Sequence, residues 1–367
     1  MKSRVLFIMQ LPPPYHGASM ANECIANSHL IKDSFNISII DIKTSNNLHD
    51  LGKFSVRKIT KSIALAFKIL FRLLSFKPRV VHFTLAPSGF AFYRDAAYVF
   101  IIKLFTRNLV LHLHGKGFQN GIENSKPFKY FSKKIFKNSY CIHLSETLQK
   151  DVPDLHVKKR FLIPYGVPVV KNNFPEKNDN STIRLLTISN YVRSKGILDI
   201  IDAVEIVVKT HTQFHVRLVG KPYDLDIKYL NNYVSERNLA NFISITGPKY
   251  GNEKFEELNN GHIFILPTYY PNEAFPVSLL EALQFGLPCI TTPEGGIPDM
   301  IEDGFTGFLV APKNKEQLAD RILQLLQNEQ MRNTMSANTK LIFEEKYTLE
   351  KFEKNIVMTI KEILAEK

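Results

Sequence analysis

The stretch LPTYYPNEAFPVSLLEALQFGLPCITTPEGGIPDMIEDGFTGFLV, residues 266–310, carries two glutamates, Glu273 and Glu281, on either side of a predicted helix start. Pro276 suits the first turn of a helix, where its missing N–H costs nothing. Gly286 ends that helix, and the apolar run after it predicts a strand. The segment therefore predicts a loop, a short helix, a turn and a strand.

The start of this helix is suited to bind phosphate, because the first N–H groups of a helix have no partner within it. The predicted phosphate-binding positions are Ala274, Phe275, Pro276 and Val277. Glu281 lies roughly 7 Å further along the helix axis, at about 1.5 Å per residue. A carboxylate there can accept both ribose hydroxyls of a nucleotide, and Glu273 can reach the group that the phosphates carry.

The two glutamates and their surroundings resemble the signature of retaining glycosyltransferases of the GT-B architecture, family 4 (glycosyl transferases group 1). The resemblance includes FILPTYY before the glutamates, and GLPCITTPEGGIPDMI and GFLV after them. A solvated helix face can also carry two such glutamates, but the strand, proline and glycine pattern disfavours that alternative. The resemblance implies an α/β fold of the GT-B type, with two Rossmann-like domains facing each other across a cleft.

The whole chain supports this organisation, since 367 residues exceed one ordinary core. Short apolar runs alternate with helical patterns, which predicts parallel sheets covered by helices. The predicted strands lie in RVLFIM, FNISIIDI, RVVHFTL, NLVLHLH, YCIHLS, RFLIP, IRLLTIS, HVRLVG, FISITG, HIFILP and PCITT.

A polar, proline-containing stretch at 163–182 breaks the series and predicts a linker. The domains expected are an acceptor-binding domain at 1–165 and a nucleotide-sugar-binding domain at 166–345. By the resemblance, a C-terminal helix at 346–367 crosses back to the first domain.

Charge is unevenly distributed. The net charge is +12, and residues 1–170 hold 25 Lys and Arg against 9 Asp and Glu, which leaves −4 for residues 171–367. The basic part is predicted to meet an anionic membrane surface or a phosphorylated acceptor. No nucleic-acid-binding motif accompanies it, so no nucleic acid is expected as a partner.

Two basic segments, 53–79 and 126–137, carry much of this charge. Each is either an ordinary crossover helix with a solvated basic face or an interfacial membrane helix, and the sequence leaves this open. If the first segment binds a membrane, Phe67, Ile69, Leu70 and Leu73 are expected to insert, provided that they face outwards and not into the domain core.

The compartment is predicted from the cysteines and the apolar runs. Cys24, Cys141 and Cys289 show no metal-binding spacing and fit a reducing environment. The first apolar run, residues 5–9, is too short for a secretory signal and predicts a strand. We therefore expect a cytoplasmic protein that is peripheral on the inner face of the cell membrane.

Two further motifs lie in the first half of the chain. PPPYHGASMAN contains Gly17 and resembles the glycine loop near the donor phosphates, although a plain strand-to-helix turn explains it equally well. LVLHLHGKGF ends a strand, and its His114 matches the family histidine that contacts the donor sugar. The alternative is a structural histidine at a strand end.

The second half opens with LTISNYVRSKGILDIIDA. Lys195 and Gly196 match the family's Lys-Gly pair, in which the lysine neutralises the departing diphosphate. Many members have an arginine where this chain has Asn190, and Arg193 is near but out of register. We therefore keep both Asn190 and Arg193 as candidates. ITGPKYGNEKFEELN resembles the loop that holds the nucleotide base.

The predicted activity is hexosyl transfer from a nucleotide diphosphate sugar to an acceptor hydroxyl, with retention of the anomeric configuration. Glu273 would bind the sugar, His114 would support it and Glu281 would hold the ribose. No Asp-x-Asp motif was found in the segments predicted to line the cleft, so no metal and no cofactor are expected. Lys195 and helix N-termini would supply the positive charge.

The expected setting is bacterial cell-surface polysaccharide or glycolipid synthesis, such as capsule or lipopolysaccharide, with a lipid-linked or saccharide acceptor. Two alternatives stay open. One is a nucleotide-sugar epimerase of similar two-domain fold, and the other is a non-catalytic binding subunit.

Overall fold

The computed structural model describes residues 2–43, 56–171, 174 and 182–366, without the side chains at 56–58. The predicted linker at 163–182 therefore lies partly outside the described residues. The chain divides into two compact units. Unit 1 consists of Met1–Gly166 and Leu349–Lys367, and unit 2 consists of Val167–Thr348.

Unit 1 is built on a six-stranded sheet of order β2-β1-β3-β4-β5-β6, and all its strand pairs are parallel. The strands are β1 (Arg4–Met9), β2 (Asn36–Asp41), β3 (Val80–Leu85), β4 (Leu109–Leu113), β5 (Tyr140–His143) and β6 (Lys159–Leu162). The helices are α1 (Gly17–Asn27), α2 (His29–Ser34), α3 (Val56–Phe76), α4 (Gly89–Lys103), α5 (Phe118–Asn124), α6 (Lys126–Phe136), α7 (Glu146–Lys150) and α14 (Leu349–Ala365).

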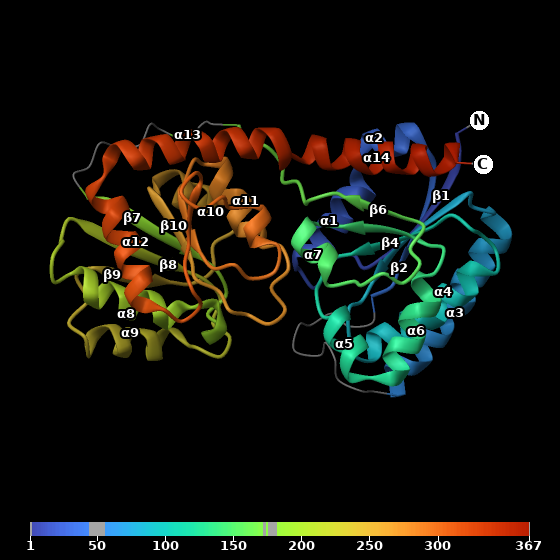
Figure 1. Cartoon of the computed structure of the whole chain (residues 1–367), viewed down its shortest axis with the longest axis horizontal. Coiled ribbons are helices and arrows are strands. Elements are labelled where there is room, and N and C mark those ends of the chain that lie inside the picture. Colours follow the sequence, from blue (N-terminus) through green and yellow to red (C-terminus); the bar gives the residue numbers. More distant parts are fainter. Residues whose placement is uncertain (1, 44–55, 172–173, 175–181, 367) are drawn as a thin grey trace. The chain divides into compact units, whose positions relative to one another are not determined.

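Helices cover both faces of this sheet, with α3, α4 and α6 on one face and α1, α2 and α14 on the other (Figure 1). The middle strand β3 is accordingly buried along its whole length. Its side chains alternate between the two faces. Val81 and Phe83 belong to the apolar core with α3, α4 and α6, so His82 points to the opposite face.

Helix α3 packs on this core through Leu65, Ile69 and Leu73. The spacing of four residues places them on one face of the helix. Ile69 and Leu73 are buried and Leu70 is half-buried, so Ile69 and Leu73 face the core and do not meet the condition for inserting into a membrane. Phe67, from the same expected set, is exposed.

Unit 2 is built on a second parallel sheet of six strands, of order β12-β11-β10-β7-β8-β9. The strands are β7 (Ile183–Ile188), β8 (Phe214–Val219), β9 (Ile243–Thr246), β10 (Ile263–Leu266), β11 (Cys289–Thr291) and β12 (Gly307–Leu309). The helices are the 3₁₀ turns η2 (Arg193–Lys195) and η3 (Ile297–Asp299), and α8 (Ile197–Val207), α9 (Ile227–Ser235), α10 (Gly251–Asn260), α11 (Val277–Gln284), α12 (Lys315–Gln327) and α13 (Glu329–Lys346).

Helices α8, α9 and α12 cover one face of this sheet, and α10, α11 and α13 lie on the other (Figure 1). In α8, Ile200, Val204 and Val207 recur at helical spacing and are buried in the core that also contains Leu318 and Ile322 of α12. Full burial of each such side chain contributes about 1.5–3 kcal/mol. No helix in the described ranges is both long and apolar enough to cross a bilayer.

Candidate active site

The carboxyl ends of β7 and β10 define the most favourable ligand position in unit 2. These two strands are neighbours in the sheet. After β7 the chain continues to β8 on one side of the pair, and after β10 it continues to β11 on the other side, so the strand order reverses between them. Ligands of doubly wound sheets bind at such a switch point. The loop after β7 contains Lys195, and the loop after β10 contains Glu273.

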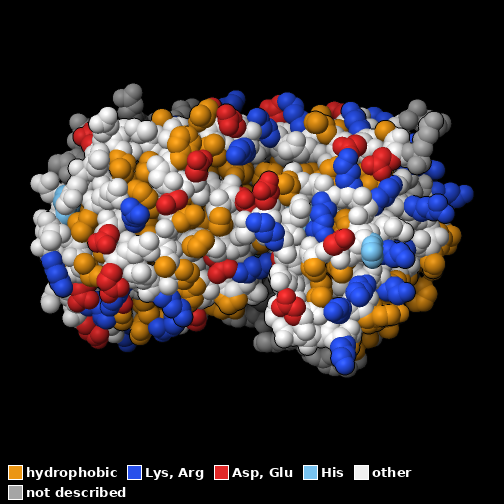
Figure 2. Space-filling view, in the orientation of Figure 1, with side chains coloured by type: hydrophobic (Ala, Val, Ile, Leu, Met, Phe, Trp, Pro, Cys, Tyr) orange, Lys and Arg blue, Asp and Glu red, His pale blue; other side chains and the backbone are white. Residues whose placement is uncertain are grey.

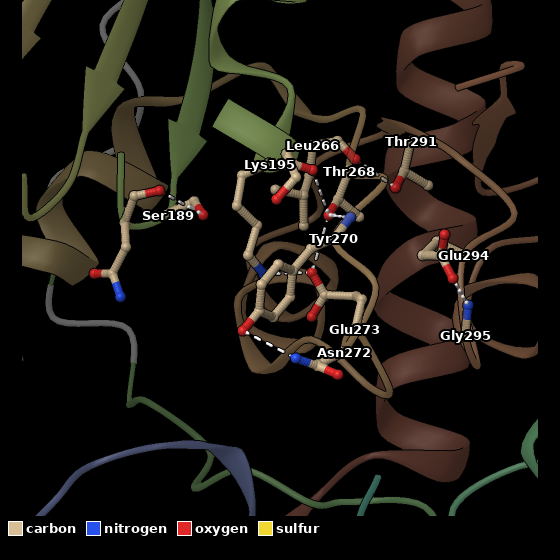
Figure 3. Close-up of polar contacts among 12 residues, drawn as sticks. Ser189, Lys195, Leu266, Thr268, Tyr270, Asn272, Glu273, Thr291, Glu294 and Gly295 are labelled. Atoms are coloured by element: carbon tan, nitrogen blue, oxygen red, sulfur yellow. Dashed lines mark hydrogen bonds and ion pairs between the residues drawn. The ribbon is translucent and has the colours of Figure 1, made fainter. Parts of the chain in front are cut away.

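Lys195 and Glu273 form an ion pair at this position. The Lys195 side chain points to the Glu273 carboxylate, and its Nζ binds Oε2 (Figure 3). The Thr268 hydroxyl donates to the same oxygen at 3.1 Å, and the Tyr270 ring centroid lies 5.1 Å from the Lys195 Nζ. Glu273 is buried, so the lysine and the hydroxyl replace water as partners of its charge.

Backbone contacts hold the two loops together. The Tyr269 N–H donates to the Ser194 carbonyl at 2.8 Å. Gly196 has φ +79°, and a Cβ there would lie 2.4 Å from the Pro267 carbonyl oxygen, so only glycine allows this approach. Gly295 is similar, since its Cβ would lie 2.3 Å from the Glu273 carbonyl oxygen. The Lys-Gly pair and the Gly-Gly turn therefore support the backbone on either side of Glu273.

Helix α11 begins one residue later than the sequence predicted. Pro276 is the N-cap, with φ −69° and ψ 118°, and Val277 is the first helical residue. Ala274 and Phe275 are buried, and the Phe275 ring packs on Tyr347 at 6.1 Å between centroids. The side chains at 274 and 275 are therefore structural, which leaves the backbone as the part of this segment that can bind phosphate.

Glu281, on α11, has a partner that the sequence analysis missed. Its Oε1 accepts a hydrogen bond from the Nζ of Lys254, on α10. Burial raises the pKa of Glu281, and the Lys254 charge acts in the opposite direction. Lys254 therefore favours the ionised form that ribose hydroxyls require. Its segment had been singled out as the loop for the base, but 27 positions separate the two residues and no local pattern links them.

Asn190 and Arg193, the two candidates for the missing arginine, are both exposed. In the described part of the chain, the Arg193 side chain makes no ion pair with Glu273, and the Arg193 backbone N–H donates to the Asp224 carboxylate at 2.8 Å. Asp224 and Asp226 form an Asp-x-Asp sequence after β8. It was not considered when the sequence was searched for a metal-binding motif. Asp226 caps α9 by accepting from the Tyr229 N–H at 2.7 Å, so both carboxylates serve backbone N–H groups.

Gly17 and His114 belong to unit 1. Gly17 is the first residue of α1, and His16 and Ser19 cap the N-terminus of this helix. The His16 N–H donates to the Ser19 hydroxyl oxygen at 3.0 Å, and the Ser19 N–H donates to the His16 Nδ1 at 3.3 Å. His114 follows β4 and is buried, and its Nδ1 lies 2.8 Å from the Tyr165 hydroxyl. Its Nε2 is buried without a hydrogen-bond partner among the described residues.

His114 also belongs to a cluster of buried histidines. Its ring lies 3.9 Å from that of His112, and the His112 Nδ1 lies 3.1 Å from the His82 Nε2. Burial lowers the pKa of all three rings, to about 4 for His82 and well below the usual range for the other two. The cluster is therefore neutral near pH 7. The sequence places His112 and His114 on the same face of one strand, but His82 was missed, because it joins them only through the pairing of β3 with β4.

A family model described as Glycosyl transferases group 1 matches residues 170–341. An uncharacterized glycosyltransferase of Methanocaldococcus jannaschii is 28% identical over 244 residues, which are 66% of this chain and 65% of that protein. The amylovoran biosynthesis glycosyltransferase AmsK of Erwinia amylovora is 27% identical over 215 residues, 51% of this chain and 52% of that protein. The chain thus spans less than two thirds of the length of these relatives.

Solved structures share the fold. The structure of Anabaena HepE in complex with UDP aligns with a TM-score of 0.74 at 16% identity, over 98% of this chain and 100% of that one. At this identity the likeness speaks for the fold alone. The two parallel sheets and this likeness confirm the predicted α/β, GT-B fold class. Residues 170–341 thus match the glycosyl transferases group 1 family.

Proposed function

We propose that this protein is a retaining glycosyltransferase that moves a sugar from a nucleotide diphosphate sugar to an acceptor hydroxyl. The observation that carries the proposal is the ion pair of half-buried Lys195 with buried Glu273 at the switch point of unit 2. The Lys195 ammonium, which can bind the leaving diphosphate, then lies beside the Glu273 carboxylate, which can accept hydrogen bonds from sugar hydroxyls. The family match covers this segment, and the structure of the neighbour HepE was solved with UDP.

The reaction breaks the bond between the anomeric carbon and the diphosphate oxygen and forms one to the acceptor oxygen. In this proposal Lys195 and the N–H groups at the start of α11 stabilise the charge on the departing diphosphate. The departing phosphate takes the acceptor proton on the same face of the sugar. In this proposal Glu273 binds the sugar and His114 supports it through its Nε2, which has no hydrogen-bond partner among the described residues.

Unit 2 would bind the nucleotide sugar, and unit 1 the acceptor. The relative AmsK is named for amylovoran biosynthesis, which supports a role in bacterial surface polysaccharide or glycolipid synthesis. The charge of residues 1–170 supports a lipid-linked or saccharide acceptor at an anionic membrane surface, on its cytoplasmic side.

Activity is expected to persist in excess EDTA, because Lys195 supplies positive charge at the diphosphate. The test is to incubate the protein with nucleotide diphosphate sugars and measure the nucleoside diphosphate released with and without acceptor. Complete loss in EDTA, with recovery on adding magnesium or manganese, would contradict the metal-free assignment.

Isomerised or free sugar formed without acceptor would indicate the epimerase, and binding without any turnover would indicate a non-catalytic subunit.

Replacing Lys254 with methionine is expected to make nucleotide affinity depend on pH. The change removes the charge that opposes the rise in the Glu281 pKa, so Glu281 takes up a proton as the pH falls. Affinity for a nucleoside diphosphate should then fall by up to about tenfold per pH unit below the new pKa. Calorimetry at pH 8 and pH 6 measures this.

Two controls accompany this variant. Lys228→Met, at an exposed position of α9, should bind the nucleotide as the unmodified protein does at both pH values. Glu281→Ala should bind more weakly at both, since it removes the acceptor for the ribose. Equal affinity of Lys254→Met at pH 6 and pH 8 would show that Lys254 does not govern the protonation of Glu281.

A further inference from the structure

The side of α3 that faces away from the core carries an apolar stripe. It consists of Ile63, Phe67, Phe71 and Leu74, whose exposed fractions are 54%, 67%, 70% and 54%. Their spacing of four, four and three residues places them on one face of the helix. Exposed single apolar residues are common, but four large ones in line on one helix mark an interaction surface.

Cations border this stripe. Lys61, Lys68 and Arg72 are exposed and lie on the helix between the stripe and the buried face of Leu65, Ile69 and Leu73. Helix α3, Val56–Phe76, contains no acidic residue. An apolar centre with a basic border on one side is the pattern of a helix that lies in a membrane interface, because long basic side chains reach the headgroups while apolar ones enter the acyl region.

The neighbouring surface has the same character. Helix α6 lies on the same face of the sheet and has no acidic residue either. Its Tyr130 is 58% exposed, and its Lys129 and Lys133 are exposed as well. Figure 2 shows hydrophobic and basic side chains close together on the part of the surface where Figure 1 places α3 and α6.

We propose that this face of α3 binds an anionic lipid bilayer, with Ile63, Phe67, Phe71 and Leu74 entering the interface and Lys61, Lys68 and Arg72 contacting the headgroups. A second copy of the chain is a poorer occupant, because it would bring the same cations against these. A nucleic acid would satisfy the cations but leave the stripe in water. The proposal deepens the proposed function, since an enzyme held at a bilayer meets a lipid-linked acceptor there.

The chain contains no tryptophan, which provides a direct test. Phe67→Trp introduces a single reporter at an exposed position of the stripe. With vesicles of phosphatidylglycerol its emission should shift to shorter wavelength, and a brominated lipid should quench it. Vesicles of phosphatidylcholine alone should produce a much smaller shift. Tyr229→Trp, at a position of α9 in unit 2 that is 40% exposed, is the matched control and should not respond.

The cations are tested separately. The triple variant K61Q, K68Q, R72Q should bind anionic vesicles about 100-fold more weakly in sedimentation, and added salt should weaken the unmodified protein toward the same level. Nucleotide binding, measured on the same preparation, should be unchanged, so that failure of this proposal is distinct from failure of the proposed function. A reporter that shifts equally on neutral and anionic vesicles, or not at all, would overturn the proposal. A shift without vesicles that grows with protein concentration would instead assign the stripe to self-association.

Discussion

Lys195→Met is expected to lower the rate of sugar transfer by about 10²–10³-fold, the loss that follows removal of one preorganised charge partner from a transition state. In the structure this ammonium binds the Glu273 carboxylate at the switch point of unit 2. In the proposed reaction it stabilises the departing diphosphate, where charge develops. The measurement is kcat with saturating donor and acceptor, since donor binding alone would change KM.

The same change also removes the counter-ion of a buried carboxylate, and breaking a buried pair in this way costs about 3–5 kcal/mol of stability. The double variant Lys195→Met, Glu273→Gln removes both charges and should recover most of that stability without recovering activity. Thr268→Val removes only the 3.1 Å hydrogen bond to Glu273 and should cost much less activity. If Lys195→Met transfers sugar at the unmodified rate, the lysine is a structural partner of Glu273 and the proposed role is wrong.

The fold was predictable because it depends on short-range patterns. Each of the eleven apolar runs overlaps a strand, from β1 to β11, and the stretch at 266–310 forms a loop, a helix, a turn and a strand in that order. The strand that escaped prediction is β12, Gly307–Leu309. This strand exists because it pairs with β11, a contact that no pattern within its own segment records.

The candidate site was predictable only in part, for a related reason. The resemblance of the sequence to the family assigns both Lys195 and Glu273 to the donor site, and the structure places them in contact. The pairing of Glu281 with Lys254 depends on how α10 packs beside α11, and the local use of Asp224 depends on its contact with the Arg193 N–H. Such contacts are set by packing between elements, which periodicity within an element does not record.

Lowering the pH from 7 to 5 is expected to destabilise unit 1 strongly, because of its buried histidines. His82, His112 and His114 are neutral in the folded protein, since burial lowers their pKa values below the ordinary 6.5. The unfolded chain takes up protons on these residues below about pH 6.5 and the folded chain does not. Stability is therefore lost as the pH falls from about 6.5 toward the folded pKa, which is about 4 for His82.

The size of the effect follows from linkage. Each histidine contributes a loss of about 2 kcal/mol at pH 5, from about 1.4 kcal/mol per pH unit over the 1.5 units below 6.5. Asp95 acts in the opposite direction, because burial raises its pKa despite the Arg94 charge, and the folded state then binds a proton more readily. His143, on β5, is also buried with a lowered pKa and acts in the same direction as the three clustered histidines. The histidines therefore outweigh the one carboxyl, and the expected net loss is a large part of the stability of an ordinary domain.

Hydrogen exchange under urea, read separately for peptides of β3–β4 and of β7–β8, measures this loss in unit 1 with unit 2 as internal reference. Unit 2 should lose much less, because burial raises the pKa of its Glu281 and this carboxyl takes up a proton in the folded state as the pH falls. His112→Gln removes one of the clustered rings and should reduce the pH dependence of unit 1 by about 2 kcal/mol between pH 7 and pH 5. His29→Gln, at an exposed position of α2, should leave it unchanged. Equal pH dependence in the two units, or in the two variants, would mean that the cluster takes up protons in the folded state, and His114 could then meet a ligand as a cation.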